Sequence, residues 1–162
     1  MVFIITSIGF MLEHIFSRFL NYPPFYCLFV ICTLVFIYPF FHHREANYLI
    51  YSFAVGLLYD VIFTNTFLFN AILFVILGYI IIKLNIYLIN NIYSTIFMAL
   101  FIIFIYLLTS YIMVSLVTEV DFIILRLLKK MYDSTLMNLL YSGVAFVIIE
   151  KISRRYKILK MN

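Results

Sequence analysis

Residues 48–82 read YLIYSFAVGLLYDVIFTNTFLFNAILFVILGYIII, and this stretch decides the fold. Two apolar runs flank the short polar turn Thr64-Asn65-Thr66. At about 1.5 Å per residue, each run crosses, or nearly crosses, a hydrocarbon layer about 30 Å thick. The pair carries one acidic side chain, Asp60, which is costly at membrane depth unless it faces the bundle interior and finds donors. We therefore predict an interior helical hairpin with the other helices packed around it.

Small and polar side chains mark one face of this hairpin. In the first run they recur at every fourth position, at Ser52, Gly56, Asp60 and Thr64. Small residues at that spacing let a second helix approach closely. In the second run, Asn70 and Gly78 lie on one side. Because antiparallel helices joined by a tight turn place residues equidistant from it at equal depth, we predict that Asp60 and Asn70 are neighbours.

The composition is that of an integral membrane protein. Of the 162 residues, 67% are hydrophobic and 11% are charged. Soluble domains carry about 25% charged residues, so a soluble fold is excluded. The apolar runs are too long, and alternate too little, for the strands of a membrane barrel. The fold class is therefore all-α, with residues 1–162 forming a single transmembrane domain.

The apolar runs predict a six-helix transmembrane bundle. The expected spans cover about 3–20, 25–41, 47–63, 67–83, 92–117 and 135–150. Residues 118–134 differ, because a charged stripe that includes Arg126 and Lys130 recurs there at helical period. We expect an amphipathic helix on the membrane surface. The alternatives are an extension of the fifth span and a helix that docks against a partner's helix.

The first span carries polar residues in its second half, at Glu13, His14 and Arg18. One interpretation is an interfacial helix end, with the long side chain of Arg18 reaching the lipid headgroups. The other is that Glu13 or His14 points into the bundle or toward a partner. The sequence leaves both open.

The distribution of basic residues predicts the orientation. Six spans place both ends of the chain on one side, and the basic tail, residues 151–162, brings that side to seven of the eleven Lys and Arg. Positive charge favours the cytoplasmic side, so we expect both termini to be cytoplasmic. Five spans with the N-terminus outside is the alternative.

The sequence contains no pattern typical of catalysis. It has no phosphate-binding loop, no nucleophile–base pair and no metal-ligand spacing, since His42-His43 lacks a third ligand nearby. We therefore predict no catalytic residues, no cofactor and no metal. We expect the chain to contact the lipid bilayer and not to bind nucleic acid.

Several segments resemble one family. The residues concerned are Gly56-Leu57-Leu58-Tyr59-Asp60, Phe69-Asn70, Leu77-Gly78-Tyr79, Pro24, Asn138-Leu139 and the basic tail. Together they resemble the rod shape-determining protein MreD family over nearly the whole chain. The sequence departs from the family at Glu13-His14, where the family often has Gln, and in the strongly charged residues 118–134.

The resemblance implies a function in cell shape. Such proteins are non-enzymatic scaffold subunits of the bacterial elongation machinery in the cytoplasmic membrane. They bind the single-span protein MreC and help organise peptidoglycan synthesis, indirectly with the MreB filament, a SEDS glycosyltransferase and a class B penicillin-binding protein. Their fold is similar to the substrate-binding subunits of energy-coupling vitamin transporters.

The alternative function is therefore the substrate-binding subunit of a small-molecule, vitamin-type transporter. Its site would be built on Asp60 and Asn70, with Glu13 or His14, in an outward-facing cavity. For either function, the structural or partner-binding candidates are Asp60, Asn70, Gly56, Ser52, Gly78, Glu13, His14, Arg126 and Lys130.

Overall fold

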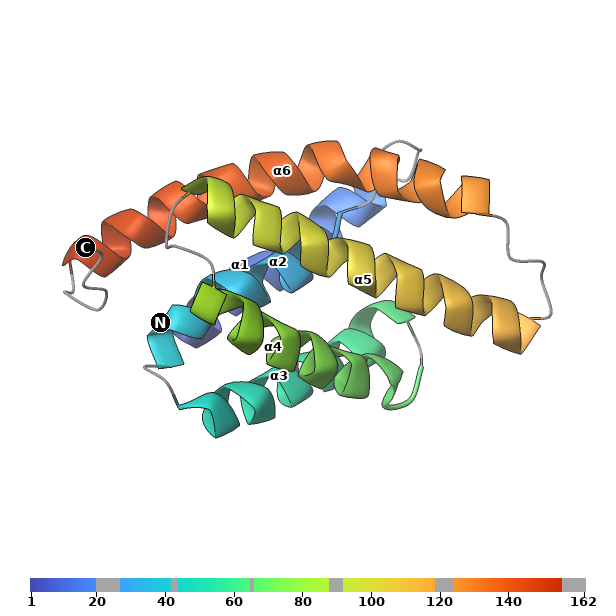
Figure 1. The fold of residues 1–162 in the computed structure, drawn as a ribbon, viewed down its shortest axis with the longest axis horizontal. Helices are drawn as coiled ribbons and strands as arrows, with labels where there is room; N and C mark the ends of the chain where they lie inside the picture. The colour runs from blue at the N-terminus through green and yellow to red at the C-terminus, as the bar shows by residue number, and fades with distance from the viewer. Residues whose placement is uncertain (20–26, 42–43, 65, 88–91, 119–123, 156–162) are drawn as a thin grey trace.

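The structure is a computed structural model that describes residues 1–19, 27–41, 44–64, 66–87, 92–118 and 124–155. Over these residues the chain forms helices and no strand: α1 (Val2–Phe19), α2 (Phe29–Ile37) with the 3-10 turn η1 (Tyr38–Phe41), α3 (Glu45–Tyr59) with the π-helical turn η2 (Asp60–Thr64), α4 (Phe69–Tyr87), α5 (Ile92–Thr118) and α6 (Ile124–Arg155). Successive helices run antiparallel, and the beginning of α1 and the end of α6 lie at the same end of the bundle (Figure 1). The predicted all-α bundle of six helices is confirmed.

Four of these helices are long and apolar enough to cross a membrane: α1, α3 with η2, α5 and α6. The other two, covering Phe29–Phe41 and Phe69–Asn85, are apolar but shorter. The chain is therefore a multi-pass membrane protein with two short helices among long ones. A short helix that begins inside the bundle must find partners there for its first backbone N–H groups.

The centre of the bundle is α2. All nine of its residues are buried, and it contacts α1, α4, α5 and α6. Its sequence, FVICTLVFI, is apolar all round, which is typical of a helix enclosed by others. The expectation that the other helices pack around the hairpin of residues 48–82 is therefore wrong, because they pack around α2. That hairpin, α3 and α4, packs along one side of α2. On its outer side α3 keeps an exposed face, for example at Ile50 and Leu58.

The hairpin itself closes as predicted, through its small residues. A methyl group built on Gly56 would lie 2.5 Å from the carbonyl oxygen of Asn70 and 2.6 Å from Cα of Ala71. One built on Gly78 would lie 3.0 Å from Oγ of Ser52. Ser52 is fully buried and donates its hydroxyl to its own helix, at the carbonyl of Tyr48. The helices therefore meet backbone to backbone at the Gly56 level.

Residues 124–134 do not form the separate surface helix that we expected. They are the beginning of α6, which continues without a break through residues 135–150 to Arg155. No Gly or Pro interrupts residues 118–142, so nothing in the sequence ends the helix near residue 134. Residues 119–123 and 156–162 lie outside the described part of the chain. Figure 1 shows α6 running beside α5.

Candidate functional site

Asp60 lies at the end of α3 and is 2% exposed. Its Oδ1 accepts hydrogen bonds from the backbone N–H of Asn70 at 3.1 Å, from Nδ2 of Asn70 at 2.8 Å and from the hydroxyl of Thr64 at 3.2 Å. The hydroxyl of Thr66 also donates to Oδ1, and the backbone N–H of Ala71 donates to Oδ2 at 3.2 Å. The predicted contact between Asp60 and Asn70 is present, both to backbone and to side chain.

This carboxylate caps a helix to which it does not belong. Asn70 and Ala71 are in the first turn of α4, whose N–H groups have no partner within the helix. A negative charge there also interacts favourably with the helix dipole. The chain enters α4 through Leu68, whose φ of 63° is left-handed and costs about 1–2 kcal/mol for a residue with a side chain. The bonds from α4 to Asp60 offset that strain.

Glu13 caps the N-terminus of α2, as Asp60 caps that of α4. It is 2% exposed, and its Oε2 accepts the backbone N–H of Val30, in the first turn of α2, at 2.8 Å. Its Oε1 accepts the hydroxyl of Tyr59 at 2.7 Å. Of the two interpretations of the first span, Glu13 pointing into the bundle is therefore the correct one. One carboxylate connects α1, α2 and α3.

The neighbours of Glu13 on α1 do not join this cluster. His14 is half-buried, with its ring 6.1 Å from that of Phe63, and Arg18 is exposed in the last turn of α1. The buried stripe of α1 is Thr6, Gly9 and Glu13, at helical spacing. Glu13 is inside because it continues this stripe.

Asn138 on α6 completes the cap of α2. It is fully buried, and its Oδ1 accepts the backbone N–H of Leu28 at 2.9 Å, while its Nδ2 donates to the carbonyl of Ser134 at 2.7 Å. Neither Asn138 nor Tyr59 is among the predicted site residues. The signal for Asn138 was an amide in an apolar segment, because a polar group at membrane depth needs an internal partner.

A cavity of about 640 Å³ lies beside these caps. Glu13, Tyr59 and Asn70 contribute polar groups to its wall, and α5 contributes Tyr106 and Ser110. Most of the remaining lining is apolar, including Leu28, Phe63, Phe69, Leu107, Met113, Val114 and Val117. Within the described residues, Oδ1 of Asn70 and Oγ of Ser110 are buried atoms without a hydrogen-bond partner.

Comparison with protein families decides what the chain is. Residues 1–156 of the 162 match the family described as rod shape-determining protein MreD. The chain belongs to the MreD family. It is therefore a rod shape-determining protein of the membrane, and the resemblance seen at Gly56–Asp60 and Asn70 is confirmed at the level of the family. Comparisons with curated proteins and with solved structures give no match.

The chemistry of the two carboxylates fits a structural protein of the MreD family. Both carboxylate oxygens of Glu13 and both of Asp60 accept at least one hydrogen bond from the protein. Among the described residues, no group of three or more His, Cys, Asp or Glu side chains is arranged to hold a metal ion. The arrangement satisfies the N-termini of α2 and α4 and joins neighbouring helices.

The remaining candidates, Arg126 and Lys130, lie on α6, the helix that also carries the cap residue Asn138. They lie near the beginning of α6, where they line a second hollow against α5. Lys130 also lines the cavity beside the caps, so the two hollows adjoin. The structure therefore brings Asp60, Asn70, Gly56, Ser52 and Gly78 together and leaves Arg126 in a different place.

Proposed function

We propose that this chain is a non-enzymatic scaffold subunit of the bacterial elongation machinery, which binds an MreC-type single-span protein and helps organise peptidoglycan synthesis. The observation that carries the proposal is the family match over residues 1–156. Through its MreC-type partner the chain would act indirectly with the MreB filament, a SEDS glycosyltransferase and a class B penicillin-binding protein.

The internal geometry supports a scaffold. Asp60 and Glu13 have their acceptor oxygens occupied by the protein itself, so they hold helices in place instead of presenting a reactive group. The outward side chains of α1 are large and apolar, such as Phe3 at 74% and Met11 at 65% exposure. A rigid interior with apolar outer faces suits recruitment of a partner's membrane helix, since close packing drives such association.

Depletion with complementation tests this function. Rod-shaped cells depleted of the protein should become round, and the wild-type gene should restore the rods. An Asp60→Ala variant should restore them poorly and co-purify with less of the MreC-type partner, whereas Asp60→Asn should restore most of both. Cells that stay rod-shaped on depletion would count against the proposal. An unchanged abundance and yield of complex for Asp60→Ala would count against the anchor role of Asp60.

The cavity keeps the transporter subunit as a second candidate function. Its volume, about 640 Å³, is within the range of small-molecule sites, and Glu13, Asn70 and Ser110 contribute polar groups to it. A vitamin-type ligand should then co-purify with the protein, and depletion should create a vitamin requirement with normal cell shape. Round cells without such a requirement exclude this candidate.

We further propose that both termini are cytoplasmic. The beginning of α1 and the end of α6 lie at the same end of the bundle, as an even number of crossings requires (Figure 1). A reporter that fluoresces only in the cytoplasm should be active when fused to either end. Activity at the C-terminus alone would favour the five-span alternative.

A further inference from the structure

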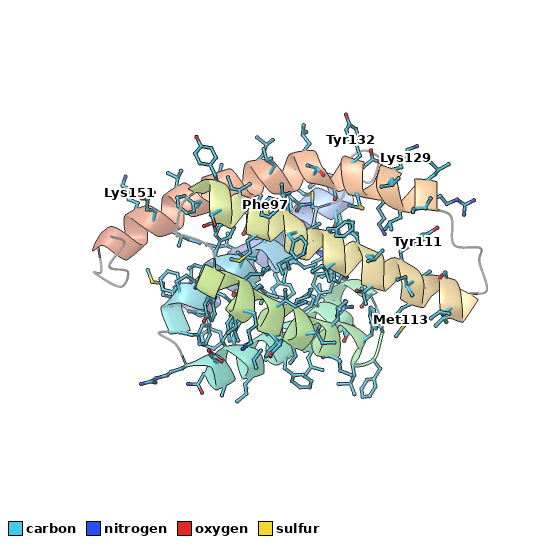
Figure 2. All side chains as sticks on the ribbon, in the orientation of Figure 1. Phe97, Tyr111, Met113, Lys129, Tyr132 and Lys151 are labelled. Carbon is cyan, nitrogen blue, oxygen red and sulfur yellow. The ribbon has the colours of Figure 1, made fainter. Side chains whose placement is uncertain are left out.

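The beginning of α6 forms a basic groove with the last third of α5. Arg126, Lys129, Lys130 and Asp133 line it from α6, and Ser110, Tyr111 and Val114 line it from α5. Its volume is about 420 Å³. Figure 2 shows Lys129 near the beginning of α6 and Tyr111 in the space between the two helices. The cationic side chains therefore follow an inter-helix hollow.

The cationic side chains of this groove favour an anionic occupant. Arg126, Lys129 and Lys130 are exposed, while Asp133 is 7% exposed. Among the described residues that line the groove, three side chains are cationic and one is a carboxylate. Leu125 at 71% and Tyr132 at 81% exposure add apolar surface to the same turns of α6. A helix with an apolar face and several cations is typical of the membrane interface, where its cations attract anionic lipid headgroups.

The groove adjoins the cavity beside the caps, whose wall along α5 includes the apolar residues Leu107, Met113 and Val117. Ser110, Val114 and Lys130 line both. Along α5 the cavity wall runs from Val117, one residue before the end of the helix, inward to Tyr106. At 1.5 Å per residue this is about 16 Å of depth, which is about half of a hydrocarbon layer. A molecule with an anionic head and an apolar chain fits both hollows at once.

We propose that this groove binds the phosphate headgroup of an anionic membrane lipid, with one acyl chain in the adjoining cavity. Arg126 and Lys129 hold the phosphate, since guanidinium and ammonium groups form charge-assisted hydrogen bonds with phosphate oxygens. The side chains that surround the chain are Leu107, Met113, Val114 and Val117. The proposal does not depend on the scaffold function, and its failure leaves that function untouched.

Native mass spectrometry of the full chain tests the proposal. The protein is purified with phosphatidylglycerol or with phosphatidylcholine of the same acyl chains, and the bound lipid is counted. The wild type should retain one phosphatidylglycerol about tenfold more tightly than phosphatidylcholine. The double variant Arg126→Gln/Lys129→Gln should lose most of that preference, since a basic residue near a membrane surface is worth about fivefold. Unchanged circular dichroism verifies that the variant is folded.

Arg18→Gln is the matched control. Arg18 is also exposed at a helix end but does not line the groove, so its substitution should leave the preference unchanged. An equal loss in this control would mean diffuse attraction to the surface and would overturn the proposal. Equal retention of the two lipids, or an unchanged preference in the double variant, would overturn it as well.

Two further measurements separate a lipid from a free phosphate. A large excess of inorganic phosphate should leave the bound phosphatidylglycerol in place. Short-chain phosphatidylglycerol, which cannot fill the cavity, should bind at least about tenfold more weakly than the long-chain lipid because each buried methylene contributes. Displacement by phosphate, or equal binding of both chain lengths, would mean a headgroup site only and would overturn the acyl-chain assignment.

Discussion

Replacement of Asp60 tests the central structural claim, that this carboxylate caps α4 across the hairpin. In Asp60→Ala the backbone N–H groups of Asn70 and Ala71 lose their acceptor. The amide of Asn70 keeps the hydroxyl of Thr64, 3.0 Å away, so it does not become an orphan. Each buried N–H left unpaired costs about 1–3 kcal/mol, and loss of the charge at the helix N-terminus adds about 0.3–1 kcal/mol. The expected loss is about 2–7 kcal/mol.

Asp60→Asn should cost less stability than Asp60→Ala, because the two carboxylate oxygens of Asp60 accept different numbers of hydrogen bonds. Oδ1 of Asp60 accepts all the side-chain donors and the N–H of Asn70, whereas Oδ2 accepts only the N–H of Ala71. An asparagine can keep its oxygen on the crowded side and place its NH₂ toward Ala71. The hydrogen bond of Ala71 and the charge are lost, about 1–4 kcal/mol in total, because the new NH₂ cannot accept from that N–H.

Unfolding of the purified protein in mixed micelles, followed by far-ultraviolet circular dichroism, measures both variants against the wild type. Because whole domains are stable by only about 5–15 kcal/mol, the alanine variant should unfold at clearly lower denaturant. A loss under about 1 kcal/mol for Asp60→Ala, or a larger loss for Asp60→Asn than for Asp60→Ala, would refute the capping argument.

Three other substitutions test the remaining contacts by the same unfolding assay. Gly56→Ala should cost about 1–3 kcal/mol, because the new methyl group would meet backbone atoms of Asn70 and Ala71 that cannot move aside. Gly143→Ala, with open space around the new methyl group, should be neutral or slightly stabilising. Equal effects of the two substitutions would contradict the close approach of α3 and α4. Glu13→Gln should cause only a small loss of stability, since the Tyr59 hydroxyl can turn to accept from the new NH₂. Glu13→Ala should cost about 2–4 kcal/mol, because the N–H of Val30 loses its acceptor. Equal losses in the two variants would exclude the helix cap. Asn138→Leu should cost about 1–3 kcal/mol by orphaning one buried N–H, and no loss would mean that water replaces the amide.

The hairpin was predictable from the sequence because its determinants are local. The residues of the stripe from Ser52 to Asp60 lie on one helix face whatever the rest of the chain does. The turn at 64–66 then places Asn70 opposite Asp60. Both the close packing at Gly56 and the Asp60–Asn70 contact follow from these two facts, and both are present.

The position of α2 and the role of Glu13 were not predictable in the same way. Both depend on contacts between residues distant in sequence, such as Glu13 with Tyr59 and Leu28 with Asn138. A hydropathy pattern gives the existence of a helix, but a helix that is apolar all round has no preferred face from which its place can be read. The continuity of α6 was missed because a charged stripe on a helix does not by itself end it.

The need for hydrogen-bond acceptors at the N-termini of α2 and α4 explains why Glu13, Asp60 and Asn138 are buried. The N–H groups of Val30 in α2 and of Asn70 and Ala71 in α4 have no acceptor within their own helices, so they need one from elsewhere. Glu13 and Asn138 supply acceptors for α2, and Asp60 supplies them for α4. Since each acceptor comes from another helix, capping and helix assembly are one event: the short helices are complete only when α1, α3 and α6 are in place. The buried polar residues of this MreD-family chain therefore specify the arrangement of the bundle, and the outer faces that a partner meets depend on them.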